Sequence, residues 1–437
     1  MLTITGAERV LVDGRTVRTG DVAVGADGRI AAQAVPGAEA LDATGAVVTA
    51  GLVNAHHHLL QTGFRTLPGT RGVAMRDWLP RMAAAYAAAG IDASLCGATA
   101  AAGLAEALLS GVTTVADHQL NWPDPAGAVD AVADTVAIAR AVAGAASDLG
   151  ARLVFVRGTA RDDPALAADS AEAVVEALVG AAANGVSDDG MRQVAVGPAG
   201  VHSDGEATFA ALRDVAMRHG LRRRTQANEQ VDTAVALERY GRRPLELLDA
   251  WGWLEPDVTV AHLCDIEPAE IALLAERGVS ATHAPGCDVP MGWGIAPVAA
   301  LRDAGIPLGL GTSGGGSNDA GHLLADARLA MQVSALVGRP LAALEVLAMA
   351  TEGGAAGLGR DDLGHLRPGA RADLCVWDVS GVADAGVADP VAGLLWASPG
   401  RRPRHVVVDG RVVVRDHRLV AADEAEIVDR LNARLAR

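Results

Sequence analysis

Short apolar strands alternate with alanine-rich helical stretches through the middle of this chain, from about residue 51 to residue 360. The strands read VVTAGLVNAHHH, GVTTVADH, RLVFVRG, QVAVGPAG, LRRRTQANE, DVTVAHLCD, GVSATHAP and IPLGLGTS. Strands that alternate with helices build a parallel sheet, and eight such units close into a barrel. The pattern therefore predicts an α/β fold, a TIM-like (β/α)8 barrel over residues 51–360.

Both ends of the chain follow a different pattern. Residues 1–50 contain short strand-like pieces such as TITGAERVLV and DVAVGADGRIAAQ, and the stretch from about residue 365 to the end resembles them, with ADLCVWDV and HVVVDGRVVVRDHRLV. Asp-Gly or a similar dipeptide lies between the apolar runs, which indicates hairpins. We expect residues 1–50 and 361–437 to form together one small β-sandwich-like domain beside the barrel.

The composition excludes several classes of function. Half of the 437 residues are hydrophobic and 21% are charged, which is typical of a globular protein. A formal net charge of −16 argues against nucleic acid and anionic membranes as partners. The four cysteines form no C-x-x-C pair and the N-terminal stretch has no signal-peptide pattern, so we expect a cytoplasmic protein. We expect its partner to be a small molecule, and the chain to form a homodimer or a higher homo-oligomer.

Three consecutive histidines, His56, His57 and His58, end the first of the central strands. Side chains alternate along a strand, so His56 and His58 point to one side and His57 to the other. Two imidazoles on one side can bind a single divalent ion at about 2.0–2.1 Å each. The sequence therefore predicts half of a metal site here, and other strands must supply the rest.

Polar residues also follow the other central strands. The active sites of (β/α)8 barrels lie at the C-terminal ends of their strands, so we expect these side chains to converge if the barrel closes. A single histidine at such a position is more often a hydrogen-bonded structural residue, and only the convergence of several favours a site. The candidates are His56, His58, Asp117, His118, His202, Gln226, Glu229, His262, His283, Ser313, Ser317, Asn318 and Asp319.

Several segments, taken in order, resemble the amidohydrolase superfamily of metal-dependent hydrolases. GLVNAHHHLLQTGFR resembles its first-strand metal motif, GVTTVADH its second strand, and the stretch from VAHLCDIEPAEI to GTSGGGSNDAGHLLADARLA its strands six to eight. LGHLRPGARADLCVWD and VVVDGRVVVRDHRLV resemble its small β-domain. MGWGIAP and GTSGGGSND place the likeness in the branch of triazine hydrolases and 8-oxoguanine-type deaminases. The resemblance covers nearly the whole chain.

In mononuclear members, the resemblance implies one metal ion held by four or five groups. His56 and His58 match the first-strand pair. The third histidine belongs to a strand-five pattern H-T-H-x-x-E, which reads RTQANE here, so Gln226 stands at the ligand position. Ser313 stands where strand eight normally supplies an aspartate, although the triazine-hydrolase pattern also carries a hydroxyl residue there. Two ligand positions are therefore substituted, and a glutamine oxygen is a weaker zinc donor than an imidazole.

The resemblance implies a hydrolase that acts on C–N bonds other than peptide bonds, in a nitrogen heterocycle such as a purine, a pterin or a triazine. One divalent metal, zinc or alternatively iron, lowers the pKa of bound water from about 15.7 toward 7. We expect Glu229 to protonate a ring nitrogen and later the leaving amine, His262 to orient the water or take its proton, and Ser313 to hydrogen-bond the water.

A further group of residues is expected to contact the substrate. Trp78 and Trp293 would stack on the ring, although ordinary core packing explains two tryptophans equally well. The complete group is Gln61, Trp78, His118, His202, His283, Trp293, Asn318 and Asp319.

Two alternatives stay open. The chain could be a metal-independent lyase, cyclase or isomerase, in which the histidines and Glu229 form a proton-transfer cluster. It could also be a non-catalytic binding protein that keeps only the pocket. We assign no role to His219, His365, His405 and His417, and we expect Cys264 and Cys287 to be small buried hydrophobic residues.

Overall fold

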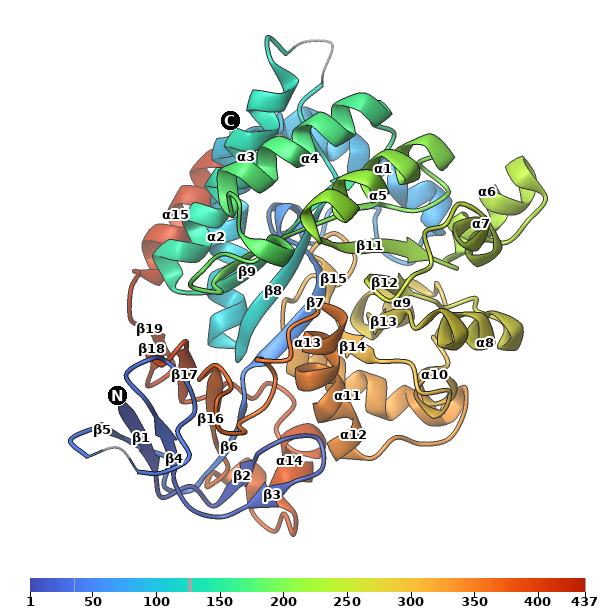
Figure 1. Cartoon of the computed structure of the whole chain (residues 1–437). Helices are drawn as coiled ribbons and strands as arrows, with labels where there is room; N and C mark the ends of the chain where they lie inside the picture. Colours follow the sequence, from blue (N-terminus) through green and yellow to red (C-terminus); the bar gives the residue numbers. More distant parts are fainter. Residues whose placement is uncertain (35, 125–127, 437) are drawn as a thin grey trace.

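The computed structural model describes residues 1–34, 36–124 and 128–436 (Figure 1). Its largest sheet is parallel, in the order β14-β13-β12-β11-β10-β9-β8-β7-β15, and a further pairing of β14 with β7 closes it. The predicted (β/α)8 barrel is confirmed. Its eight strands are β7 (Leu52–His58), β8 (Val112–Gln119), β9 (Arg152–Thr159), β10 (Arg192–Pro198), β11 (Arg222–Ala227), β12 (Val258–His262), β13 (Ser280–His283) and β14 (Leu308–Leu310). The two-residue β15 (Ser313–Gly314) follows β14 and also pairs with β7.

Helices surround the strands, and local sequence signals fix where several of them begin and end. Asp92, Asp130 and Asp163 accept hydrogen bonds from first-turn N–H groups of α2, α3 and α4. Gly150 and Gly220 close α3 and α5 in the left-handed conformation. The helices are α1 (Met75–Ala89), α2 (Ala93–Leu109), α3 (Ala131–Leu149), α4 (Pro164–Leu178), α5 (Glu206–His219), α6 (Gln230–Tyr240), α7 (Pro244–Ala250), α8 (Pro268–Arg277), α9 (Pro285–Met291), α10 (Val298–Asp303), α11 (Leu323–Val333), α12 (Ala343–Ala348) and α13 (Gly354–Gly357).

Both chain ends build a pair of smaller sheets at one side of the barrel (Figure 1). One sheet has the order β4-β1-β5 and the other β19-β18-β17-β16-β6-β2-β3, with an apolar core that includes Ile4, Val24 and Val376. Strand β6 of the N-terminal part pairs antiparallel with β16 of the C-terminal part, so the predicted joint domain is confirmed. Domain limits at residues 50 and 360 stay a prediction. The strands are β1 (Leu2–Thr5), β2 (Arg9–Leu11), β3 (Val17–Arg18), β4 (Val22–Val24), β5 (Glu39–Asp42), β6 (Ala46–Ala50), β16 (Leu374–Asp378), β17 (His405–Val408), β18 (Arg411–Arg415) and β19 (Arg418–Leu419).

The residues of one turn explain a hairpin in the small β-domain. The strand pattern did not predict two helices in the C-terminal region. Asp409 and Gly410 join β17 to β18 with positive φ angles of 50° and 75°, as a type I′ turn requires. The C-terminal region is not only strands, however, because α14 (Pro390–Trp396) and α15 (Glu424–Leu435) interrupt and follow them. Asp423 caps α15, which packs against α2 of the barrel.

No single helix of the described chain has the length and apolarity to cross a membrane. Helices α1 and α2 would meet those criteria only as a pair, which is bent by 117°.

Candidate active site

Strand β7 carries the histidine pair into the mouth of the barrel. The rings of His56 and His58 lie 4.8 Å apart between centres, while His57 points the other way and its Nδ1 lies 2.8 Å from Thr312 Oγ1. A Cβ at Gly311 would lie 2.6 Å from the carbonyl oxygen of His56, so only glycine lets the end of the last strand approach this closely. The alternation expected from the sequence is present.

A third imidazole reaches the same place from β12. The ring centre of His262 lies 5.1 Å from that of His56, and its Nδ1 donates to Asp288 Oδ1 at 2.9 Å. Glu229 Oε1 lies 3.8 Å from the same nitrogen. Because Nδ1 carries the hydrogen, Nε2 of a neutral His262 presents a lone pair.

Buried ring nitrogens without partners indicate what this cluster can bind. Within the described chain, Nε2 of His56 and Nε2 of His262 are buried and have no hydrogen-bond partner. His58 donates from Nδ1 to the carbonyl oxygen of His118 at 2.7 Å, which leaves its Nε2 as the lone-pair nitrogen. Two imidazoles bound to one tetrahedral zinc at about 2.0–2.1 Å place their ring centres about 5 Å apart. The spacing of His56 from His58 and from His262 therefore fits a shared divalent ion.

The two substituted positions adjoin these rings. Gln226 and Ser313 both line the same cavity as His58 and His262. Ser313 pairs in parallel register with His57, which places it beside the histidine strand. Both supply neutral oxygen donors, so the donor set has three imidazoles and, among these predicted ligand positions, no carboxylate.

Burial and neighbouring charges set the protonation of the cluster. Burial, together with the adjacent His58, lowers the pKa of His56 well below its usual value, and burial lowers that of His58 to about 4. Burial also lowers the pKa of His262, but Glu229 and Asp288 raise it more, to about 9. Burial raises the pKa of Glu229. The site therefore combines two neutral imidazoles, His56 and His58, with a His262 that carries a proton near neutral pH and a carboxyl group whose pKa is raised.

A cavity of about 740 Å³ lies over this cluster. Four residues predicted to contact the substrate line it, namely Gln61, Trp78, His202 and Trp293. The indole rings of the two tryptophans meet edge to face at 5.4 Å, and their Nε1 atoms donate to the carbonyl oxygens of Gly316 and Val73. They form a rigid apolar wall, and their stacking on a substrate ring stays a prediction.

Four other predicted contacts do not line this cavity, and their contact with a substrate stays a prediction. His118 donates from Nε2 to the carbonyl oxygen of Gly197, and Asn318 turns to Thr312 O and Asp326. Asp319 pairs with Arg71. His283, at the end of β13, is fully buried away from the cavity wall. His118, Asn318 and Asp319 make contacts within the scaffold, whereas both ring nitrogens of His283 are buried without a hydrogen-bond partner among the described residues.

Two further residues of the site, Asp288 and Cys287, follow β13. Asp288 is fully buried and orients His262. Cys287 is buried, as expected for a small hydrophobic residue, yet it lines the cavity. Both lie in HAPGCD, directly after a strand end, so the rule that selected His283 would have found them had it been applied a few residues further along the chain.

His202 is held at the cavity wall by Asp232. Its Nδ1 lies 3.1 Å from Asp232 Oδ1. Burial lowers the pKa of His202, but the hydrogen bond and charge of Asp232, with Glu229 and Asp204, raise it overall.

The His202–Asp232 pair predicts a pH-dependent contribution to the free energy of unfolding. A histidine whose pKa is raised by folding stabilises the fold below its unfolded pKa of about 6.5, and that gain is lost as the pH rises through the folded value. We expect His202→Asn to lower the free energy of unfolding more at pH 6 than at pH 9, by a difference on the order of 1 kcal/mol. Urea unfolding of both proteins at both pH values measures it. An equal loss at the two pH values would show that the pair is not charged.

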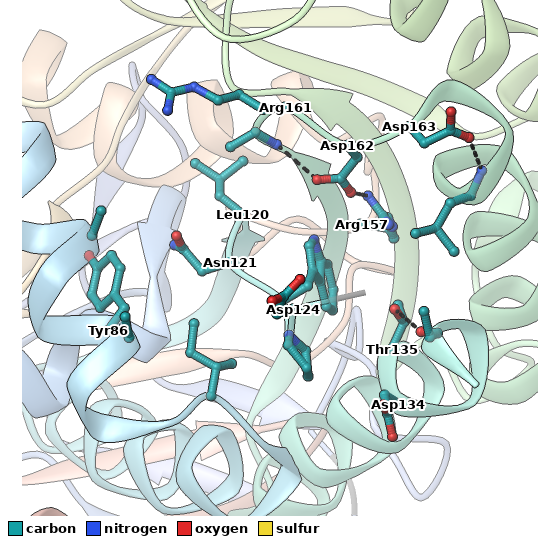
Figure 2. Close-up of a pocket in the computed structure, with 18 of the residues that line it drawn as sticks. Tyr86, Leu120, Asn121, Asp124, Asp134, Thr135, Arg157, Arg161, Asp162 and Asp163 are labelled. Atoms are coloured by element: carbon teal, nitrogen blue, oxygen red, sulfur yellow. Dashed lines mark hydrogen bonds and ion pairs between the residues drawn. The ribbon is translucent and has the colours of Figure 1, made fainter. Parts of the chain in front are cut away.

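A second cavity, of about 630 Å³, adjoins the first. Figure 2 shows Tyr86, Leu120, Asn121 and Arg161, which line both cavities, on one side of it. On the other side, Arg157 pairs with Asp162 at 2.6 Å. The guanidinium group of Arg157 also lies 4.8 Å from the ring centre of Trp122. The space above the histidine cluster therefore continues sideways over the segments that follow β8 and β9.

Comparison with known proteins now identifies the family. The model of the amidohydrolase family matches residues 47–413. This chain belongs to the amidohydrolase family. It is 34% identical over 412 residues to the 8-oxoguanine deaminase of Pseudomonas aeruginosa, covering 92% of this chain and 89% of the relative. It is 33% identical over 446 residues to the 5-methylthioadenosine/S-adenosylhomocysteine deaminase of Haloarcula marismortui, covering 100% and 98%.

A solved structure agrees with this membership. The zinc complex of atrazine chlorohydrolase TrzN from Arthrobacter aurescens TC1 superposes with a TM-score of 0.90 at 32% identity over the whole of both chains. The predicted likeness to triazine hydrolases and 8-oxoguanine deaminases is confirmed.

Proposed function

We propose that this amidohydrolase hydrolyses a C–N bond of a nitrogen heterocycle with water activated by one divalent metal ion, zinc in the first instance. One observation carries the proposal: the ring centre of His56 lies about 5 Å from those of His58 and His262, beside a cavity of about 740 Å³, and the cluster includes two buried ring nitrogens without partners among the described residues. Relatives named as deaminases and a zinc-bound chlorohydrolase support it.

His56, His58 and His262 would hold the ion, with the amide oxygen of Gln226 as a weaker fourth donor. When bound, the ion supplies a Lewis acid that makes water a nucleophile near neutral pH. The chain's own residues do the rest of the chemistry around it. Asp288 keeps the hydrogen of His262 on Nδ1, so that Nε2 faces the cluster.

Glu229 is the group that moves protons. Its carboxyl is 5% exposed at the cavity wall, and its raised pKa lets it carry a proton at Oε. It gives that proton to a ring nitrogen as the attacked carbon becomes tetrahedral, takes up a proton that the attacking water loses, and passes this proton to the leaving amine. The second proton of the water, released as the carbonyl group forms, returns Glu229 to its acid form. Ser313 can accept or donate a hydrogen bond but neither takes up nor releases a proton near neutral pH, so the acid–base catalysis falls to Glu229.

The volume of the cavity indicates a small-molecule substrate. Small-molecule sites commonly enclose about 300–1,000 Å³, and this one adjoins a second space of about 630 Å³. Room for a substituent is therefore present beside the wall formed by Trp78 and Trp293. We propose a purine-, pterin- or triazine-like ring that sits against this wall.

One observation favours the metal-independent alternative. Arg224 points into the barrel one layer below Gln226, fully buried, and donates to the carbonyl oxygen of Ala55. Its Nη1 has no partner among the described residues, and its charge lowers the pKa of His56. The guanidinium charge of Arg224 lies close to His56 and opposes the binding of a positively charged metal ion there. A lyase, cyclase or isomerase that works without a metal ion would not face this repulsion.

Release of ammonia tests the proposal directly. We expect the zinc-loaded protein to release ammonia from at least one member of a panel of aminopurines, aminopterins and aminotriazines, and His56→Ala to abolish it with the loss of the metal. His219→Ala, a histidine on the outer helix α5, serves as the matched control. Full activity in His56→Ala would exclude the metal mechanism.

Location in the cytoplasm, a homo-oligomeric state and the absence of nucleic-acid and membrane partners remain predictions from the sequence.

A further inference from the structure

Cys287 lies in the barrel mouth between the strands that carry His262 and lead to Ser313. It follows β13, the strand that lies between β12 with His262 and β14, whose chain continues to Ser313. Its side chain is buried, yet it lines the same cavity as His262, Gln226 and Ser313. No other cysteine is part of this wall.

The contacts of Cys287 are with the residues of the site itself. Its Sγ, a ring nitrogen of His262 and a carboxylate oxygen of Asp288 all lie within 4.8 Å of one another. Ser313 and Ser317 line the same cavity as the thiol. Ser313 stands where the family supplies its carboxylate, so the thiol and this position face the same cavity.

A second observation indicates a ligand. Nε2 of His262 is buried, 1% exposed for the whole residue, and has no partner among the described residues. Asp288 accepts the hydrogen of His262 Nδ1 at Oδ1, and its Oδ2 is buried without a hydrogen-bond partner among the described residues. Asp288 does not line the cavity, whereas Cys287 lines it together with His262, so Cys287 is the member of this triad that can share an ion with His262 in the cavity.

Charge and softness favour the thiolate. The substitution at Ser313 removed the one anionic donor, and Gln226 is neutral, so a dication among these donors is poorly balanced. A thiolate is anionic and a strong zinc ligand, and Cys and His ligands combine in many tetrahedral zinc sites. We propose that Cys287 is a ligand of the divalent ion, in the place of the missing carboxylate; this inference rests on the proposed metal-dependent function. Binding of the ion replaces the thiol proton, which leaves to solvent, and involves no redox change.

Cobalt(II) in place of zinc tests this without any activity assay. We expect the Co²⁺-loaded wild-type protein to show a near-ultraviolet thiolate-to-cobalt charge-transfer band. Cys287→Ser should abolish the band and weaken Co²⁺ binding at least about tenfold. Cys264→Ser is the matched control, because Cys264 also lies close to Asp288 but does not line the cavity; it should keep both band and affinity.

The outcomes separate the two proposals. Bound cobalt with visible ligand-field bands but no thiolate band would overturn the role of Cys287 and leave the metal-dependent function standing. A thiolate band that survives Cys287→Ser and disappears in Cys264→Ser would also overturn it. A protein that binds no cobalt at all would overturn both proposals.

Discussion

Glu229→Gln is expected to lower the turnover number at least about 100-fold, within the usual range for loss of a general acid–base group. Glutamine keeps the shape and the hydrogen bonding of the side chain but cannot carry a proton. The buried carboxyl lies 3.8 Å from His262 Nδ1 and lines the cavity, and no other cavity group combines its burial with a raised carboxyl pKa. Steady-state rates of ammonia release, compared at saturating substrate, measure the loss.

Two controls show whether the loss of turnover in Glu229→Gln comes from the missing proton. Metal content should be unchanged in Glu229→Gln, because the residue is not among the proposed ligands. Glu276→Gln, at an exposed position on α8, should keep wild-type turnover. Wild-type turnover in Glu229→Gln would remove the residue from the mechanism, whatever its pKa.

Gln226→His combined with Ser313→Asp is expected to raise zinc affinity at least about 100-fold. Structural zinc sites with four good ligands bind with about 10–16 kcal/mol, roughly 3 kcal/mol per ligand, so two better ligands have room for a gain of this size. The new carboxylate would be balanced by the ion, which limits the cost of burying it. Calorimetric titration of the wild type, each single variant and the double variant resolves the two contributions.

The activity of the double variant then shows whether Gln226 and Ser313 are adaptations of the site or losses of two metal ligands. A gain of metal with a loss of native turnover would mean that the wild-type site is adapted to weak metal binding or to metal-free chemistry. A gain of metal with new or faster hydrolysis of purine- or triazine-like rings would mean that two ligands were lost. Equal zinc affinity in wild type and double variant would show that positions 226 and 313 do not face His56 and His58.

The barrel and the core of the site were predictable because strand geometry is regular. A side-chain period of two separates His57 from His56 and His58, and parallel strands bring their C-terminal ends, and with them His262, to one mouth. These arguments need only the order of strands along the chain. The joint β-domain followed from the hairpin signals at both ends.

The rest of the site could not be predicted from the sequence, because it depends on the direction in which side chains point after the strands end. Asn318 and His118 occupy expected positions, but a nearby backbone carbonyl oxygen binds each more favourably than an open cavity would. Asp288 and Cys287 lie on the short helix α9, whose direction strand periodicity does not predict. Arg224 replaces the first histidine of the strand-five pattern, and only the three-dimensional structure brings its charge close to His56.

The metal content of the protein, purified without chelator and then titrated with Zn²⁺, tests the central claim most directly. The arrangement of His56, His58 and His262 predicts saturation at one ion per chain, with His56→Ala or His58→Ala removing it. A stoichiometry near zero in the wild type, even with excess Zn²⁺, would contradict the metal-dependent mechanism and favour the metal-independent chemistry that the unpaired Arg224 allows.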